Sequence, residues 1–374
     1  MKIAHISFTP YRLTFREPLP TAQGMWQHRE GFVICCEDTE GKISYGEAAP
    51  LPSFDTEDLA QCAAILELHC ARLQGEILPD LENWLAAFTN MNYRQKLADL
   101  LAPLADYPAA RHGLETALLG LHPLQQLQSQ DLLKINGLIG AVQPECATEK
   151  TIKLLNSGYT CLKIKFSSRN DLEFASDLAR FQAVIAGIKI YFTQTYFTQI
   201  ISHKKILLRL DVNQSWQLEQ ALVYMQKLQN HLSCELYELD RLFSDNQPLI
   251  AIEYIEQPVA NLMDLKTLTQ QNILPVAADE SCRNLTQIRE IIIQKAANIL
   301  VLKPMVLGGI LTTFTAVNES RNHGIASVLT SSLDGAIAEF YNTNLGIYLA
   351  KQGYIDRHCG LGTGNLFVEN LCYR

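Results

Sequence analysis

The 374-residue sequence predicts an α/β fold in which a parallel β/α barrel follows an N-terminal α+β domain. Two observations support this prediction. From about residue 134 onward, short apolar runs rich in β-branched residues alternate with helix-like stretches, as in repeated βα units. Before that point, strand-like segments come first and helix-like segments follow, which is typical of α+β modules.

We predict three strands followed by helices in the N-terminal region. Together they are expected to form a domain over residues 1–130. Alternating segments occupy residues 3–13 and 31–38, and a third strand follows a turn at Glu40–Gly41. A helical pattern begins at Thr56, the expected N-cap, and continues to about residue 127.

The C-terminal region predicts a barrel over residues 131–354, with residues 355–374 packed on the N-terminal domain. Seven short apolar runs are strand candidates, and they occupy residues 134–140, 161–166, 206–213, 251–258, 273–281, 298–304 and 325–332. Helix-like stretches separate most of them, and this number of βα units favours a barrel over an open sheet. No Gly-x-Gly-x-x-Gly follows a first strand, which argues against a dinucleotide-binding fold.

Two segments do not fit the βα repeat. Residues 191–205 contain YFTQ twice and are rich in aromatic residues, and residues 233–249 are mixed and acidic. Each lies between one charged strand and the next, so we expect both to be peripheral insertions.

Composition restricts the class of protein. A formal net charge of −8 argues against a nucleic-acid partner, because no basic cluster offsets it. The ten cysteines are scattered and lack metal-type spacing, which favours free thiols in a reducing compartment. The start of the chain does not resemble a signal peptide, and no run approaches the ~18 apolar residues of a membrane span. We therefore expect a cytoplasmic enzyme with a small-molecule substrate; the sequence does not predict its oligomeric state.

Five of the apolar runs end in charged residues. In chain order these residues are Lys163 with Lys165, Asp211, Glu256, Asp279 and Lys303. A buried charge is costly unless it is paired or bound to a metal. The C-terminal ends of parallel barrel strands converge on one face, so these charges are expected to form one site.

The three carboxylates predict a divalent cation. Three oxygen ligands plus water suit Mg²⁺ or Mn²⁺, and the absence of His and Cys from the set argues against zinc. The alternative is that each acid caps the helix that follows its strand.

The lysines predict proton transfer beside that cation. Lys163 and Lys165 alternate along one strand, so their side chains share a face. Burial and a nearby metal would lower the pKa of each lysine, which would allow a neutral amine to act as a base. Lys303 ends a later strand and is expected to face them across the barrel. Such a site suits removal of a proton next to a carboxylate, with the metal stabilising the enolate. The alternative is that these lysines are solvated strand ends.

The order Lys-x-Lys, Asp-x-Asn, Glu-Gln-Pro, Ala-Asp-Glu-Ser, Leu-Lys-Pro resembles the enolase superfamily, in particular its muconate-lactonizing subgroup. The histidine base of the mandelate-racemase subgroup is missing, and Lys303 stands at the position that defines the lysine type. Further matches lie at residues 45–59, 110–118, 303–310 and 329–338. The resemblance implies a modified TIM barrel, (β/α)7β, with an N-terminal α+β capping domain.

Within the subgroup, residues 46–54 (GEAAPLPSF), 208–216 (LRLDVNQSW) and 360–364 (GLGTG) most resemble the o-succinylbenzoate synthase family. That family implies a hydro-lyase of menaquinone and phylloquinone biosynthesis, located in the cytoplasm or, in a photosynthetic eukaryote, the plastid stroma. The implied reaction is the Mg²⁺-dependent syn dehydration of 2-succinyl-6-hydroxy-2,4-cyclohexadiene-1-carboxylate to 2-succinylbenzoate.

The resemblance also implies roles for individual residues. Lys165 and Lys303 would be catalytic, and Asp211, Glu256 and Asp279 would hold Mg²⁺. Residues expected to contact substrate or support the metal shell are Lys163, Arg209, Asn213, Ser331 and Ser332. The segment at residues 18–31 would be a loop that closes over the substrate, with Arg29 and Gly24 as anchors, and Asp334 would stand where a Glu is common.

Three other functions compete with this one. An N-acylamino acid racemase or dipeptide epimerase of the same subgroup would use the same two lysines, one on each face of the substrate. A lysine aldolase would form a Schiff base on a barrel. A non-catalytic scaffold would have no reason to keep five strand ends with buried charge.

Overall fold

The computed structural model describes residues 1–21, 24–124, 133–196, 205–242 and 250–371. They fall into two compact units, which are treated separately below. The first unit comprises residues 1–134, 282–288 and 302–374, and the second comprises residues 135–281 and 289–301. The domain boundaries near residues 130 and 354 stay a prediction.

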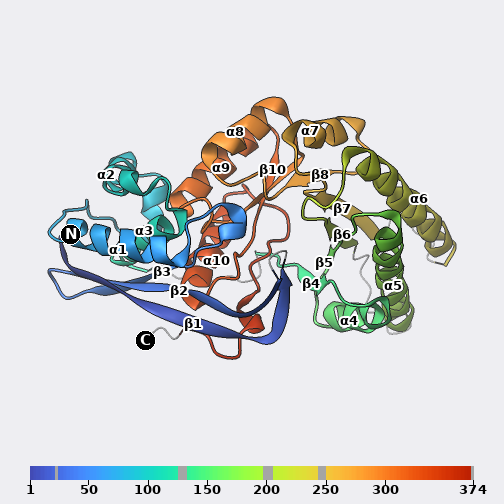
Figure 1. Ribbon diagram of the computed structural model, residues 1–374, viewed down its shortest axis with the longest axis horizontal. Coiled ribbons are helices and arrows are strands. Elements are labelled where there is room, and N and C mark those ends of the chain that lie inside the picture. Colours follow the sequence, from blue (N-terminus) through green and yellow to red (C-terminus); the bar gives the residue numbers. More distant parts are fainter. Residues whose placement is uncertain (22–23, 125–132, 197–204, 243–249, 372–374) are drawn as a thin grey trace. The chain divides into compact units, whose positions relative to one another are not determined.

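The first unit contains a three-stranded antiparallel sheet, covered by helices (Figure 1). Its strands are β1 (Ile3–Thr21), β2 (Gly24–Asp38) and β3 (Ile43–Ala48), in the order β1-β2-β3. The predicted turn is present: Gly41 has a φ of 81°, and its N–H donates to Asp38 O. The helices that follow are η1 (Pro52–Phe54), α1 (Leu59–Leu73), η2 (Trp84–Phe88), α2 (Met91–Leu101), η3 (Ala102–Leu104) and α3 (Pro108–Gly120).

The expected substrate loop at residues 18–31 is mostly strand, which corrects the prediction. β1 and β2 stay paired almost to the hairpin tip, with Leu19 opposite Trp26 and Thr21 opposite Gly24. A register shift after Thr14 allows the strands to resume pairing beyond an irregular stretch. The extended hairpin was not recognisable because Pro18 and Pro20 interrupt the alternating pattern.

The first long helix begins two residues later than predicted. Asp58, and not Thr56, is the N-cap of α1: its carboxylate accepts from Gln61 N at 2.8 Å, and Gln61 Oε1 accepts from Asp58 N at 3.0 Å. This is a capping box built on an acid. Thr56 instead accepts a hydrogen bond from Leu51 N, so it stabilises the preceding loop.

The rest of the first unit contains α9 (Ile310–Asn322), β10 (Ala326–Leu329), α10 (Ala336–Lys351) and η5 (Gly364–Leu366). The C-terminal segment lies along β1. Phe15 and Phe367 stack with ring centroids 5.0 Å apart, and Val368 N donates to Thr14 O at 2.8 Å.

The second unit contains the βα repeats. Its elements are β4 (Gly137–Gly140), α4 (Pro144–Asn156), β5 (Cys161–Lys165), α5 (Asp171–Tyr196), β6 (Ile206–Asp211), α6 (Leu218–Leu242), β7 (Ile250–Glu256), α7 (Leu262–Gln271), β8 (Val276–Ala278), most of α8 (Leu285–Gln294) and β9 (Ile299–Leu302). With β10, the strands form a seven-stranded sheet in chain order, β4 to β10. The predicted α/β fold is therefore confirmed. No pairing between β10 and β4 occurs among the described strands, so a closed (β/α)7β barrel stays a prediction.

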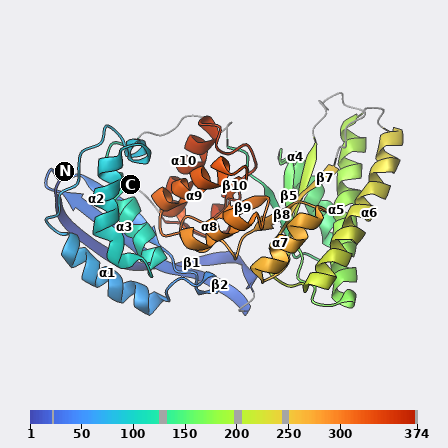
Figure 2. The same cartoon turned by 90° about the horizontal axis from the view of Figure 1, so that it is seen from above.

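The two expected insertions extend helices where they are described. Residues 191–196 continue α5, and residues 233–242 continue α6. The two helices lie side by side in both views (Figures 1 and 2), and Lys189 of α5 forms an ion pair with Glu235 of α6. The remaining parts of both insertions, residues 197–204 and 243–249, lie outside the described residues.

Other expectations from composition can be compared with the structure. The nine cysteines that the structure describes are free thiols. Among the described residues, no helix has both the length and the apolar character that crossing a membrane requires.

A buried carboxylate joins the N-terminal sheet to α10. Glu47, on β3, is fully buried; it accepts from Tyr11 Oη at 2.6 Å, from Gly335 N at 2.7 Å and from Ala338 N at 2.9 Å. The last two donors are the N-cap and a first-turn residue of α10, where N–H groups have no partner within the helix. Burial raises the pKa of Glu47, and the charge of Asp334 raises it further.

Replacing Glu47 with Gln should lower the free energy of unfolding by about 1–3 kcal/mol, because the amide turns an N–H₂ toward backbone donors. Tyr11→Phe is the matched control: it removes one hydrogen bond to the same carboxylate and should cost about 1 kcal/mol. Urea unfolding followed by circular dichroism measures both variants. A Glu47→Gln protein as stable as wild type would contradict the anchoring role.

Candidate active site

The register of three parallel strands aligns three of the predicted site residues. Lys165, the last residue of β5, is the register partner of Asp211 at the end of β6. Asp211 is in turn the partner of Glu256, the last residue of β7. Since paired residues of parallel strands project to the same side, the three side chains form one row at the carboxyl ends of the strands. The sequence-based expectation that charges converge here is met for this set.

Lys163 supplies positive charge to that row. Its Nζ lies 2.9 Å from Asp211 Oδ2 and 2.7 Å from Glu256 Oε1. Lys165 Nζ is farther away, 3.9 Å from Asp211 Oδ2, and its side chain is about one-third exposed. Lys163 is therefore the counter-charge of the two carboxylates, while Lys165 is more accessible to a substrate.

The carboxylates around Lys163 determine the direction of its pKa shift. Burial alone would lower the pKa, but Asp211, Glu256 and Asp279 outweigh burial and hold the pKa well above its usual value. In this ion-paired arrangement, Lys163 is an ammonium. The expectation of a lowered pKa applies to a lysine beside a bound metal, and it stays a prediction.

Gln257 positions the loop that carries Asp279. The side chain of Gln257 is fully buried; its Oε1 accepts from Asp279 N at 2.8 Å and from Ser281 N at 3.2 Å, and its Nε2 donates to Ser281 Oγ at 2.7 Å. Sequence reasoning used the Glu-Gln-Pro motif only for its Glu, so it missed this residue. The motif itself contained the signal, since a polar amide beside a buried strand end needs partners.

Asn213 and Arg209 have identifiable partners. Asn213 Nδ2 donates to Glu280 Oε1 at 2.8 Å, which links the loop after β6 to the loop after β8. Arg209 is buried; its Nε donates to Glu253 Oε2 at 2.7 Å, and its guanidinium lies 4.8 Å from the ring centroid of Tyr254. Arg209 lies two residues before Asp211 on β6. Its contacts with Glu253 and Tyr254 tie β6 to β7 just before the row.

Lys303, the other predicted catalytic lysine, belongs to the first unit, directly after β9. It is 8% exposed, and its Nζ lies 4.1 Å from the ring centroid of Phe54 in η1. Its predicted place opposite Lys165 stays a prediction.

Ser331 and Ser332, in the loop after β10, are organised by Asp334. Asp334 is fully buried, and its Oδ2 accepts from Ser331 Oγ at 3.2 Å, Ser332 N at 3.2 Å and Asn342 Nδ2 at 3.0 Å. Burial is the main cause of the raised pKa of Asp334. The carboxylate of Asp334 stabilises the conformation of its own loop. Its hydrogen bonds are therefore made to the protein, and the side chain does not face outward as a substrate-binding residue would.

Arg29 does not have the expected character of a substrate anchor. It is buried, and its guanidinium donates to four backbone carbonyls: Ala49 O at 2.6 Å, Pro50 O at 2.7 Å, Leu333 O at 3.2 Å and Glu30 O at 3.3 Å. Through these four hydrogen bonds, the Arg29 guanidinium fixes the backbone of two loops. A sequence pattern cannot reveal this role, because the acceptors are main-chain atoms distant along the chain.

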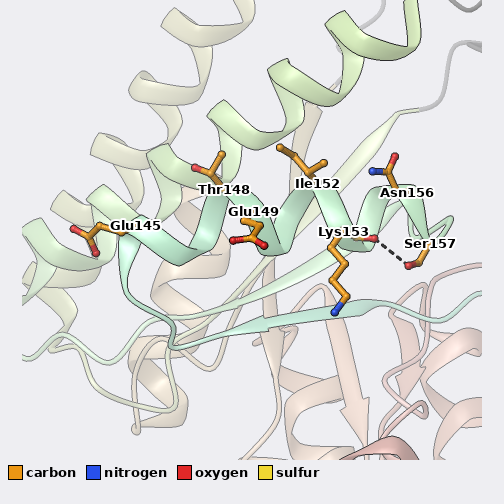
Figure 3. Close-up of a pocket in the computed structure, with 7 residues that line it drawn as sticks. All are labelled: Glu145, Thr148, Glu149, Ile152, Lys153, Asn156 and Ser157. Carbon is orange, nitrogen blue, oxygen red and sulfur yellow. Dashed lines mark hydrogen bonds between the residues drawn. The ribbon is translucent and has the colours of Figure 1, made fainter.

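A depression of about 670 Å³ lies elsewhere in the second unit. Its lining comes from α4 and the residue after it, and Figure 3 shows these side chains along one helix. The lining residues are Glu145, Thr148, Glu149, Ile152, Lys153, Asn156 and Ser157. None of them is a predicted site residue, and they do not converge on a common point.

The row at β5–β7 fits a hard divalent cation by the chemistry of its donors. Asp211 and Glu256 accommodate a positive group between them, as their contacts with the Lys163 ammonium show, and they offer the carboxylate oxygens that Mg²⁺ prefers. Within the described ranges, no group of three or more His, Cys, Asp and Glu side chains is arranged as a metal ligand set. The positive group in contact with both carboxylates is the Lys163 ammonium.

The chain is similar to several known proteins. Residues 241–367 match the family model described as Enolase C-terminal domain-like. A hydrophobic dipeptide epimerase of a Flavobacteria bacterium is 28% identical over 349 residues, covering 89% of this chain and 84% of that protein. An o-succinylbenzoate synthase of Thermobifida fusca is 28% identical over 243 residues, covering 65% of this chain and 63% of that protein.

A solved structure shares the fold. The dipeptide epimerase of Enterococcus faecalis, complexed with Mg and the dipeptide L-Leu-L-Tyr, superposes with a TM-score of 0.74 at 22% identity, covering 96% of this chain and 90% of that one. The relatives are therefore enzymes with two different activities on one fold. The resemblance to the enolase superfamily is confirmed: residues 241–367 match its enolase C-terminal domain-like model, and the similar proteins are members of that superfamily.

Proposed function

We propose that this protein is a Mg²⁺-dependent enzyme that removes a proton next to a carboxylate. The observation that carries the proposal is the row formed by Lys165, Asp211 and Glu256 on three adjacent strands. It combines an accessible amine with buried carboxylates, which are the components needed to take a proton and to hold a cation for the resulting negative charge. A helix-capping role for Asp211 and Glu256 is less consistent with their contacts with Lys163.

Asp211, Glu256 and Asp279 would hold the metal. The last residue lies in a loop that Gln257 fixes, and all three are buried. When bound, Mg²⁺ would neutralise the negative charge that develops on the substrate carboxylate. Lys163 would then serve as a neighbouring positive charge for the same group of carboxylates.

We further propose that the reaction is a dehydration, as in the o-succinylbenzoate synthases. Lys165 would take the α-proton as the C–H bond breaks, and then return a proton to the departing hydroxide, so that water leaves and a double bond forms. Lys303, as an ammonium, would stabilise the enediolate from the other side. This choice is supported by residues 46–54, 208–216 and 360–364 and by the synthase relatives.

Epimerisation of dipeptides or racemisation of N-acylamino acids is the second candidate. It is favoured by the names of other relatives, which are dipeptide epimerases. This chemistry uses the same row but needs Lys165 and Lys303 to exchange protons from opposite faces of one carbon. The two candidates therefore differ in what Lys303 does.

The purified protein with Mg²⁺ should dehydrate 2-succinyl-6-hydroxy-2,4-cyclohexadiene-1-carboxylate, measured as loss of the diene absorbance. EDTA should abolish turnover, and Lys165→Ala should reduce kcat about 10²–10⁴-fold, because a general base is lost. Lys189→Ala is the matched control, since Lys189 is an ion-paired lysine on α5 and should leave kcat unchanged. Turnover of N-succinyl amino acids or dipeptides, without dehydration, would reverse the choice.

Lys303→Arg separates the two candidates, because arginine keeps the charge but is not a base at neutral pH. A dehydratase that uses one base should retain measurable turnover, reduced about 10–100-fold. An epimerase should lose α-proton exchange from one face of the substrate, which NMR in D₂O detects. Retention of exchange from both faces would contradict the assigned roles of the lysines.

A further inference from the structure

The loop at residues 49–57 is held firmly at its start. Arg29 donates to Ala49 O and Pro50 O, and Ala49 N donates to Met305 Sδ at 3.4 Å. Met305 lies two residues after Lys303, so the segment that carries the lysine and the loop are in direct contact. Ala49, Met305, Ala109 and Ala338 also form one buried apolar cluster.

The same loop is held at its other end. The buried carboxylate of Glu57 accepts from Ala109 N at 3.2 Å and Ala110 N at 2.7 Å, in the first turn of α3. Asp55, which adopts a left-handed conformation with a φ of 57°, forms an ion pair with Arg283. Phe54 therefore projects from a short helix whose two flanks are fixed.

Phe54 presents its ring to Lys303 at a distance of 4.1 Å between Nζ and the ring centroid. This is well within the range in which an ammonium is attracted to an aromatic face, and the attraction increases when the cation is withdrawn from water. Lys303 is 8% exposed, so most of its hydration is lost. A neutral amine would be attracted far less strongly to the same aromatic face.

We propose that Phe54 is a positioning residue that holds Lys303 as a cation at a fixed place. The inference rests on the proposed function, and it assigns Lys303 the role of a fixed charge that stabilises the enediolate. A lysine held as a cation suits dehydration with a single base. It suits racemisation less well, because there Lys303 must also accept a proton.

The test compares Phe54→Leu, which fills similar volume without a ring, with Phe54→Trp, which restores a ring. Phe8→Leu is the matched control, because it removes another aromatic residue of the same unit, one that packs on Phe32. In the Mg²⁺-supplemented assay, Phe54→Leu should lower kcat about tenfold with little change in KM, whereas Phe54→Trp and Phe8→Leu should stay close to wild type.

A second measurement does not depend on turnover. The rate of Lys303 acetylation, followed by peptide mass spectrometry relative to Lys189, reports how firmly the ring of Phe54 holds the amine in place. Phe54→Leu should accelerate acetylation of Lys303 about tenfold, and Phe54→Trp should restore the slow rate. A purely steric shield predicts that Leu protects as well as Phe.

The outcomes separate the inference from the proposed function. Unchanged acetylation of Lys303 in Phe54→Leu would overturn the positioning role, whatever the substrate proves to be. Absence of dehydration by wild type, together with accelerated acetylation in Phe54→Leu, would overturn the dehydratase proposal and leave the contact between Phe54 and Lys303 supported.

Discussion

The register of β5, β6 and β7 is the constraint on which the site depends. Pairing Lys165 with Asp211, and Asp211 with Glu256, brings a lysine and two acids into one row, although they lie up to 91 positions apart in the sequence. A slip of one residue in any of these strands would turn its side chain to the opposite face. Because the buried side chains of the strands fix the register, the apolar core of the second unit also fixes the positions of these three side chains.

Charge balance is the second requirement of this arrangement. Asp211 and Glu256 are buried, and Lys163 compensates them at short range. A buried carboxylate without such a partner would be strongly destabilising. The same balance explains why the pKa of Lys163 is raised, and why two lysines on one strand differ in character: one is enclosed by acids, and the other is partly exposed.

The sequence predicted the strands and the row well, for a clear physical reason. A short apolar run that ends in a charge is a local pattern, and the parallel βα repeat brings such ends together. The roles of Arg29 and Glu47 were not predictable, because each depends on backbone groups of distant segments. The hairpin at residues 18–31 was missed because prolines and a register shift hide its alternation. Phe54 was part of a recognised motif, but only the structure shows its contact with Lys303.

We propose that the row and Asp279 together hold one divalent cation. This can be measured by electron paramagnetic resonance of Mn²⁺ titrated into wild type and into Asp211→Asn, Glu256→Gln and Asp279→Asn. We expect a single Mn²⁺ site in wild type, with affinity about tenfold or more lower in each variant, because each variant loses a charged ligand. Mn²⁺ affinity that is the same in wild type and all three variants would contradict it.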